Sequence, residues 1–318
     1  MHKAILEVQE ISVMIGDRMV LYPISLELLP GQKLAIAGET GSGKSTLLKA
    51  IAGLQNLKSG AVYLQGERVE EAWEKLIPGH RKIAYLSQHF ELRNNYRVQE
   101  ILSYAEKVTE QEAAEIYRLC QIDHLLNRKT DQLSGGERQR IAMARLLVGA
   151  PALFLLDEPF SNLDALHKQT MKQVILDLGK AMEINWVLVS HDPGDWLSWA
   201  DELLILREGK QLQKGDPASL FNAPEDEYAA GLLGAYSVLS EREWEQLSGE
   251  RLKGPKIIRP AKLQLNTVHT APLKGHIEES EFVGYGYLLT IALETGSCIK
   301  LFHKEACQPE SAVGVQLR

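Results

Sequence analysis

One segment of the sequence brings glycines, a lysine and hydroxyl side chains together at the spacing of a phosphate-binding loop. It matches the pattern GxxxxGK[ST] and lies between an apolar run and a segment with helical periodicity. Glycines let the backbone aim its N–H groups at phosphate oxygens, the helix start adds partial positive charge, and Lys44 adds a full charge. The Ser45 hydroxyl is a candidate Mg²⁺ ligand. The candidate nucleotide-binding residues are Gly38, Glu39, Thr40, Gly41, Ser42, Gly43, Lys44, Ser45 and Thr46.

Two adjacent acids follow the apolar run 153–156. Asp157 lies where a strand would end, so its carboxylate can reach the carboxyl edge of a sheet and hold Mg²⁺ through water. Glu158 is the candidate to orient or deprotonate the water that attacks the phosphorus atom. An acidic pair after a strand can also cap a helix, but its combination with the phosphate loop favours the catalytic interpretation.

A second glycine-rich turn precedes a segment with helical periodicity through Leu147. Its residues are Ser134, Gly135, Gly136 and Glu137. Such a turn is a helix N-terminus with exposed N–H groups and a hydroxyl, and it can bind phosphate. Because the first loop already has this role within one chain, two such half-sites suggest a head-to-tail dimer. A capped helix start at Ser134 is the simpler interpretation, and the two are compatible.

These motifs resemble those of the ABC ATPases, and three further short motifs follow in the expected order. Residues 85–88 resemble the Q-loop, 161–164 the D-loop and 189–192 the switch-histidine motif. The resemblance covers about residues 4–234. It implies that two nucleotide-binding domains sandwich two ATP molecules, with the phosphate loop of one copy facing the Ser134 turn of the other.

The same resemblance assigns roles to single residues. Gln88 would sense and ligate Mg²⁺ together with Ser45 and Asp157, and it would contact the transport partner. His191 would contact the γ-phosphate and keep the attacking water aligned with the catalytic glutamate. Asp164 would link the two ATP sites of the dimer.

The sequence departs from the family pattern where adenine binds. An aromatic side chain near the first strand usually stacks on adenine, but Ile15 stands at or near that position and Tyr22 is the nearest aromatic. We therefore expect adenine to be held more loosely than is usual in the family.

The pattern of elements fits an α/β P-loop NTPase core. Short apolar runs alternate with segments of helical periodicity, which predicts a largely parallel sheet between helices. The resemblance implies a RecA-like sheet with an antiparallel β subdomain and a helical insert, here expected over 97–126. The expected central strands, each buried on both faces, are 33–37, 82–86, 152–156 and 186–189.

The chain beyond residue 234 is predicted to form a separate, small C-terminal β-barrel of OB-like type. Short alternating runs such as 287–293 are separated by glycines, among them Gly275 and Gly314, and this spacing is typical of a small barrel. Residues 258–263 resemble the beginning of the OB-like domain of importer ATPases. The expected domains are 1–234 for the nucleotide-binding domain, with a helical subdomain at about 89–132, then a linker at 235–254 and the β domain at 255–318.

Composition excludes several classes of protein. The 318 residues, 45% hydrophobic and 24% charged, are long enough for about two domains and exclude a disulfide-stapled or mostly disordered chain. A net charge of −7 leaves no basic footprint for nucleic acid. The three cysteines match neither a CxxC pair nor a zinc site, and neither a signal peptide nor a membrane span is apparent. We therefore expect a cytosolic protein that reaches a membrane only through a partner.

Further resemblance selects the importer branch of the family. Residues 154–164 and 209–217 resemble the sugar, polyamine and inorganic-ion importer group, whereas a second ATPase core and a long heptad insertion are missing. This implies a Mg²⁺-dependent ATPase subunit at the cytoplasmic face of the membrane. Its implied partners are a second copy of itself, an integral membrane permease docking near Gln88 and 90–96, and indirectly an extracytoplasmic solute-binding protein. The short tail slightly favours an inorganic ion as the substrate.

Two rival functions remain open at this point. A soluble ABC ATPase acting in translation or DNA repair would co-purify with ribosomes or DNA rather than with a permease. A P-loop kinase or GTPase would leave the Ser134 turn and His191 without a role. The β domain could bind substrate or a signalling protein, or it could serve only to stabilise the dimer.

Overall fold

The computed structural model describes residues 3–88, 92–161, 163–251 and 253–318. The chain divides into two compact units, Met1–Pro217 and Ala218–Arg318. Within the described residues, no helix has the length and apolar character needed to cross a membrane.

The first unit contains two sheets. A four-stranded antiparallel sheet has the order β2-β1-β4-β5, and a six-stranded sheet has the order β10-β9-β3-β8-β7-β6, in which only β10 runs antiparallel to its neighbour. The first sheet consists of β1 (Leu6–Ile15), β2 (Arg18–Leu28), β4 (Ser59–Leu64) and β5 (Glu67–Arg68). The second consists of β3 (Lys33–Ala37), β6 (Ile83–Leu86), β7 (Leu153–Asp157), β8 (Asn185–Val189), β9 (Glu202–Arg207) and β10 (Lys210–Gly215).

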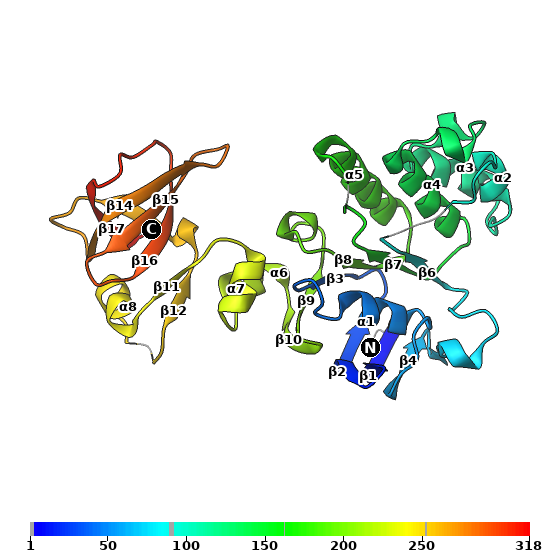
Figure 1. Cartoon of the computed structure of the whole chain (residues 1–318), viewed down its shortest axis with the longest axis horizontal. Coiled ribbons are helices and arrows are strands. Elements are labelled where there is room, and N and C mark those ends of the chain that lie inside the picture. The colour runs from blue at the N-terminus through cyan, green and yellow to red at the C-terminus, as the bar shows by residue number, and fades with distance from the viewer. Residues whose placement is uncertain (1–2, 89–91, 162, 252) are drawn as a thin grey trace. The chain divides into compact units, whose positions relative to one another are not determined.

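The main core of this unit lies where one helix packs between the two sheets. Leu47, Leu48 and Ile51 fall on one face of α1 and are fully buried against apolar residues of both sheets. Figure 1 shows α1 between the sheets, with α4 and α5 on the other side of the six-stranded sheet. The helices are α1 (Lys44–Ile51), α2 (Val98–Ser103), α3 (Glu110–Leu119), α4 (Gly135–Leu147) and α5 (Ala165–Ala181), and the short 3₁₀ turns are η1 (Ala72–Glu74), η2 (Asp123–Leu125), η3 (Thr130–Gln132) and η4 (Pro193–Asp195).

The expected P-loop NTPase core is confirmed, and the four expected central strands form within one residue of their bounds. Every residue of β7 and β8 is buried, as expected for parallel strands covered on both faces. The expectation is wrong for β6, because Ile83 and Tyr85 are only half-buried. This strand lies at the edge of the sheet and has a neighbour on one side only.

The expected helical insert is confirmed by α2, α3 and η2. Helix α3 begins with Thr109, whose side chain accepts a hydrogen bond from the N–H of Glu112, while Glu112 caps the N–H of Thr109 in return. The expected permease-docking segment includes Phe90, which lies outside the described residues.

The second unit is built on a five-stranded antiparallel sheet with the order β13-β17-β14-β15-β16. The two edge strands, β13 and β16, contact each other, so the sheet curls as a small barrel does. The sheet consists of β13 (Leu263–Asn266), β14 (Leu273–Phe282), β15 (Tyr287–Leu293), β16 (Cys298–His303) and β17 (Ala312–Leu317). The other elements are α6 (Pro217–Asn222), which starts at the boundary, α7 (Glu227–Leu233), β11 (Ser237–Leu239), α8 (Glu241–Ser248), β12 (Lys256–Ile258) and η5 (Pro260–Lys262).

Two details of the second unit differ from expectation. The division between the units falls after Pro217 rather than 234, and the expected linker 235–254 contains β11 and α8, whose Leu239 and Leu247 join the core of the second unit. Gly275 lies inside β14 and Gly314 inside β17 rather than between strands. A Cβ on Gly275 would come within 2.2 Å of the carbonyl oxygen of Ala292, and one on Gly314 within 2.3 Å of the Ala271 Cβ. A glycine in a strand thus marks close approach of two backbones.

Candidate nucleotide-binding site

The phosphate loop connects the end of β3 to the start of α1. Gly43 is the N-cap of α1 with φ 101°, and a Cβ there would lie 2.6 Å from Leu21, so only glycine fits. Lys44 is buried, and its ammonium donates to the carbonyl oxygens of Gly38 and Glu39 at 2.7 and 2.8 Å. Burial lowers the pKa of Lys44, although the nearby carboxylates of Glu158, Asp157 and Glu39 act in the opposite direction.

One buried hydroxyl in this loop is available to a ligand. Ser42 Oγ has no hydrogen-bond partner within the described parts of the chain. A buried polar atom of this kind costs free energy unless a ligand or water pairs with it. The loop therefore fits a phosphate group in the place where the sequence predicted one.

Oxygen atoms suited to a hard cation meet beside this loop. Ser45 Oγ donates to Asp157 Oδ1 at 2.8 Å, and the Tyr85 hydroxyl donates to Asp157 Oδ2 at 2.7 Å. Burial and the hydrogen bond to Asp157 raise the pKa of Tyr85, so the phenol keeps its proton and remains a donor. Hydroxyl, carboxylate and amide oxygens are the ligands that Mg²⁺ prefers, and the donor set of Ser45, Asp157 and Gln88 fits this ion.

The residue after Asp157 faces the loop that follows β8. Glu158 Oε2 lies 2.9 Å from His191 Nδ1 and accepts a hydrogen bond from Ser161 Oγ at 3.2 Å. The Glu158 side chain is mostly buried whereas His191 is exposed. A carboxylate held in this way can accept a proton from a water molecule placed between it and a phosphate.

A cavity of about 350 Å³ joins these groups. The sequence-predicted residues Thr40, Gly41, Gly43, Lys44, Ser45, Thr46, Gln88, Glu158 and His191 line it, together with Val20 and Ser161. Gly38, Glu39 and Ser42 belong to the same loop but not to this lining, and Asp157 contacts the loop through Ser45. The structure thus brings together residues from five separate segments of the first unit.

The Ser134 turn is placed elsewhere, outside the residues that line this cavity in the described chain. Ser134 is the N-cap of α4: its Oγ accepts from the N–H of Glu137 at 3.3 Å, and Glu137 Oε2 accepts from the N–H of Ser134 at 2.8 Å. These bonds and Arg128, 3.6 Å from Glu137, lower the pKa of Glu137. Gly135 is exposed, with open space around it.

Asp164 also lies outside the cavity lining and caps α5. Its carboxylate accepts from the backbone N–H of His167 at 2.9 Å and lies 2.7 Å from His167 Nδ1, and these contacts lower its pKa. A Cβ on Gly136 would come within 2.7 Å of the His167 ring. The first turn of α5, which Asp164 caps, therefore lies against the Ser134 turn within one chain.

The sequence alone did not reveal the ion pairs that hold the loop containing His191. Asp195 is buried, and Lys168 and Lys172 from α5 each lie 2.8 Å from its Oδ1, while Ser190 Oγ donates to its Oδ2 at 2.6 Å. Lys168 also pairs with Asp192 at 2.5 Å. The i, i+4 spacing of two lysines on one helix was a usable signal, but nothing in the sequence identified their partners.

Tyr85, Ser161 and Val20 are further site residues that the sequence did not identify. Val20 lies on the same hairpin as Ile15, which is 54% exposed. Tyr22 points its ring toward Lys210, whose Nζ lies 4.6 Å from the ring centroid. Neither Ile15 nor Tyr22 is among the described lining residues, and that lining contains no phenylalanine, tyrosine or tryptophan.

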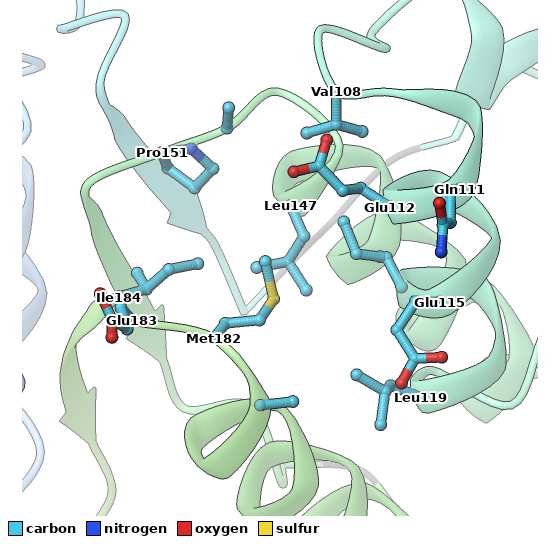
Figure 2. A pocket seen from close by; sticks show the side chains of 13 residues that line it. Val108, Gln111, Glu112, Glu115, Leu119, Leu147, Pro151, Met182, Glu183 and Ile184 are labelled. Carbon is cyan, nitrogen blue, oxygen red and sulfur yellow. The ribbon is translucent and has the colours of Figure 1, made fainter.

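A larger cavity of about 510 Å³ lies between α3, the end of α4 and residues 181–184. Figure 2 shows apolar side chains such as Leu147, Met182 and Ile184 around it, with Glu112 and Glu115 on the α3 side. Lacking a lysine or arginine in its described lining, it does not suit a phosphate ligand. The cavity beside the phosphate loop, which is lined by Lys44, is the candidate nucleotide site.

Comparisons with known proteins agree with this geometry. Residues 21–161 match the family model described as "ABC transporter". The chain is 31% identical over 293 residues to the spermidine/putrescine import ATP-binding protein PotA of Bacillus cereus, covering 89% of this chain and 85% of that protein. It is 32% identical over 300 residues to the maltose/maltodextrin import ATP-binding protein MalK of Yersinia pestis. This match covers 85% of this chain and 80% of that protein.

Solved structures give the same result. The cbiO1 protein of Clostridium perfringens, part of the ABC transporter complex cbiONQ, aligns with a TM-score of 0.61 and 26% identity over 69% of this chain and 90% of that chain. The ATP-binding subunit of another ABC transporter aligns with a TM-score of 0.62 and 25% identity over 72% and 99%.

Proposed function

Because the chain belongs to the ABC transporter family as an ATP-binding subunit of the importer type, an ATPase coupled to transport, we propose that it binds ATP with Mg²⁺ and drives a separate membrane permease. One observation supports this most strongly: the phosphate loop, the Ser45–Asp157 pair and the Glu158–His191 pair share one cavity.

The proposed hydrolysis uses groups already in place. Lys44 and the loop N–H groups would bind the β- and γ-phosphates. Ser45, Gln88 and, through water, Asp157 would hold Mg²⁺, which would supply positive charge to the phosphate oxygens. Glu158 takes a proton from the attacking water as its oxygen bonds to the γ-phosphorus and the bond to the ADP oxygen breaks. His191 contacts the γ-phosphate and keeps Glu158 oriented.

We further propose that each site is completed by a second copy of the chain. The Ser134 turn begins α4, its Gly135 is exposed, and the turn does not line the cavity of its own chain in the described residues, whereas a helix N-terminus suits a phosphate. In a head-to-tail dimer it would cover the ATP bound by the partner copy. Asp164 contacts His167, and the His167 ring lies against Gly136. A change at the Ser134 turn would then move Asp164, and this would couple the two ATP sites of the dimer.

The proposed location is the cytoplasmic face of the membrane, held there by the permease through Gln88 and the segment up to Tyr96. A solute-binding protein outside the membrane would deliver the solute. The relatives named for polyamines and for maltodextrins match about equally well, at 31% and 32%, so identity does not select a substrate. The expectation of an inorganic ion as the substrate stays a prediction.

Mass spectrometry of proteins that co-purify from detergent-solubilised membranes tests the proposal. The tagged Glu158→Gln variant with ATP should hold the closed dimer and retain a polytopic permease in stoichiometric yield. Recovery of ribosomal or DNA-bound proteins without a permease would contradict the importer function. Lys44→Ala is the matched control, since losing the phosphate partner should prevent ATP from trapping the dimer.

A further inference from the structure

The Asp157 carboxylate is held at both of its oxygens. Ser45 Oγ donates to Oδ1 at 2.8 Å, and the Tyr85 hydroxyl donates to Oδ2 at 2.7 Å. Asp157 is buried, so these hydrogen bonds decide how the carboxylate is turned. The family motifs account for Ser45 but give no role to Tyr85.

Sheet register explains how Tyr85 reaches this position. Strands β6 and β7 are parallel neighbours in which Tyr85 pairs with Leu155. Side chains of paired residues in neighbouring strands point to the same face, as do residues two apart in one strand, so Tyr85, Leu155 and Asp157 share a face. The phenol spans the distance of two residues along the strand and meets Asp157 at its carboxyl end.

We propose that Tyr85 is a positioning residue for Mg²⁺: its hydroxyl holds Asp157 Oδ2 so that Oδ1 stays turned toward Ser45. This inference rests on the proposed ATPase function and extends its metal site. Without the phenol, the carboxylate is free to rotate about its last torsion and must be ordered again whenever the ion binds. Outer partners that orient metal ligands change metal affinity by roughly 10–100-fold when removed.

The ring and the hydroxyl of Tyr85 have separable effects. The ring packs against the main core of the first unit. A purely structural residue would act through this packing, which Tyr85→Phe retains. Removing only the hydroxyl therefore tests the hydrogen bond to Asp157.

Binding of a fluorescent ATP analogue provides a readout other than activity. In EDTA, Tyr85→Phe should bind the analogue with an affinity within about twofold of that of the unsubstituted chain. When Mg²⁺ is added, the analogue should bind more tightly, and the Mg²⁺ concentration that gives half of this increase should be ~10-fold higher for the variant. Saturating Mg²⁺ should restore most of the hydrolysis rate. Tyr63→Phe is the control. It removes the hydroxyl of another half-buried tyrosine, in β4, and should leave the Mg²⁺ titration unchanged.

Two outcomes would overturn the inference. In the first, the unsubstituted chain shows Mg²⁺-dependent hydrolysis and Tyr85→Phe gives the same Mg²⁺ titration. Tyr85 then has no positioning role, and a lower thermal midpoint of the variant would not change this. If the original chain shows no Mg²⁺-dependent binding or hydrolysis, the proposed function fails, and this inference fails with it.

Discussion

At the scale of single residues, Glu158 is held in a backbone conformation that is unfavourable for a side chain with a Cβ. Its φ is 50°, and its N–H donates to the carbonyl oxygen of Val189 at 3.0 Å. This turn directs the carboxylate toward His191 instead of along the strand. Backbone strain of this kind persists where the surrounding structure holds it, and it often accompanies a functional residue.

Glu158→Gln should bind ATP normally and hydrolyse it at least ~100-fold more slowly, because a positioned base contributes 10²–10⁴-fold. Steady-state phosphate release and nucleotide binding measure the two effects separately. Glu208→Gln is a closely matched control, since Glu208 is exposed and has the same φ of 50°. If Glu158→Gln hydrolysed ATP at the normal rate, another residue would be the general base, and His191 would be the first alternative.

Ile15→Trp should tighten ATP binding. Ile15 is 54% exposed and lies on the hairpin that carries Val20 into the cavity wall. Stacking of an aromatic ring on a base contributes at least ~1 kcal/mol, which corresponds to about fivefold in affinity. Titration with ATP and with inorganic triphosphate measures the gain, which should appear for ATP only. Leu29→Trp, at another exposed aliphatic side chain, should change neither.

At the scale of elements, α5 connects the D-loop to the His191 loop. The helix is capped by Asp164 at its start, and one or two turns later Lys168 and Lys172 reach Asp195 and Asp192. Hydrogen bonding to Lys168 lowers the pKa of Asp192. A displacement of α5 would therefore move the loop that carries His191.

Lys172→Met should destabilise the first unit by about 1–3 kcal/mol, because Asp195 is only 2% exposed at its side chain and would lose one of its charged partners. Hydrolysis should also slow, since the His191 loop is held less firmly. Urea unfolding and phosphate release measure both effects. Lys180→Met on the same helix, at an exposed position, should show neither. Unchanged hydrolysis in a destabilised Lys172→Met variant would confine the network to a structural role.

At the scale of the whole molecule, the chain has two units with separate cores. In the second unit Glu243, 1% exposed, ties α8 to the turn between β15 and β16 by accepting hydrogen bonds from Ser297 Oγ at 2.8 Å and from Thr295. Burial acts to raise the pKa of Glu243, but these bonds and those from Ser240 outweigh it and hold the pKa below its ordinary value.

A carboxyl group whose pKa is lowered by folding stabilises the protein above its unfolded pKa, here about 4.5, and loses this contribution as the pH falls through the lower folded value. Glu243→Gln should therefore destabilise the second unit at pH 7 and flatten its stability curve below pH 4.5. Calorimetry with and without ATP measures the unfolding of each unit separately, because ATP should raise the unfolding temperature only of the unit that binds it. If Glu243→Gln lowered the unfolding temperature of the ATP-sensitive transition instead, Glu243 would not act through the second unit. Glu250→Gln, at an exposed position, is the control.

Contiguous segments of the sequence determined much of the fold and of the site. The phosphate loop, the acids after β7 and the bounds of β3, β7 and β8 could be predicted because each depends on neighbouring residues: backbone N–H groups, a helix start and apolar periodicity are local properties. The same holds for the helical insert and for the antiparallel strand β15.

Only the tertiary structure decided which of these segments meet. The order β3-β8-β7-β6 places Tyr85 against Asp157 and His191 against Glu158, and it leaves β6 half-exposed at the sheet edge. The packing of Leu239 and Leu247 likewise assigns 235–254 to the second unit rather than to a linker. Strand order and packing follow from the balance of burial over the whole chain, and no short stretch of sequence carries that information.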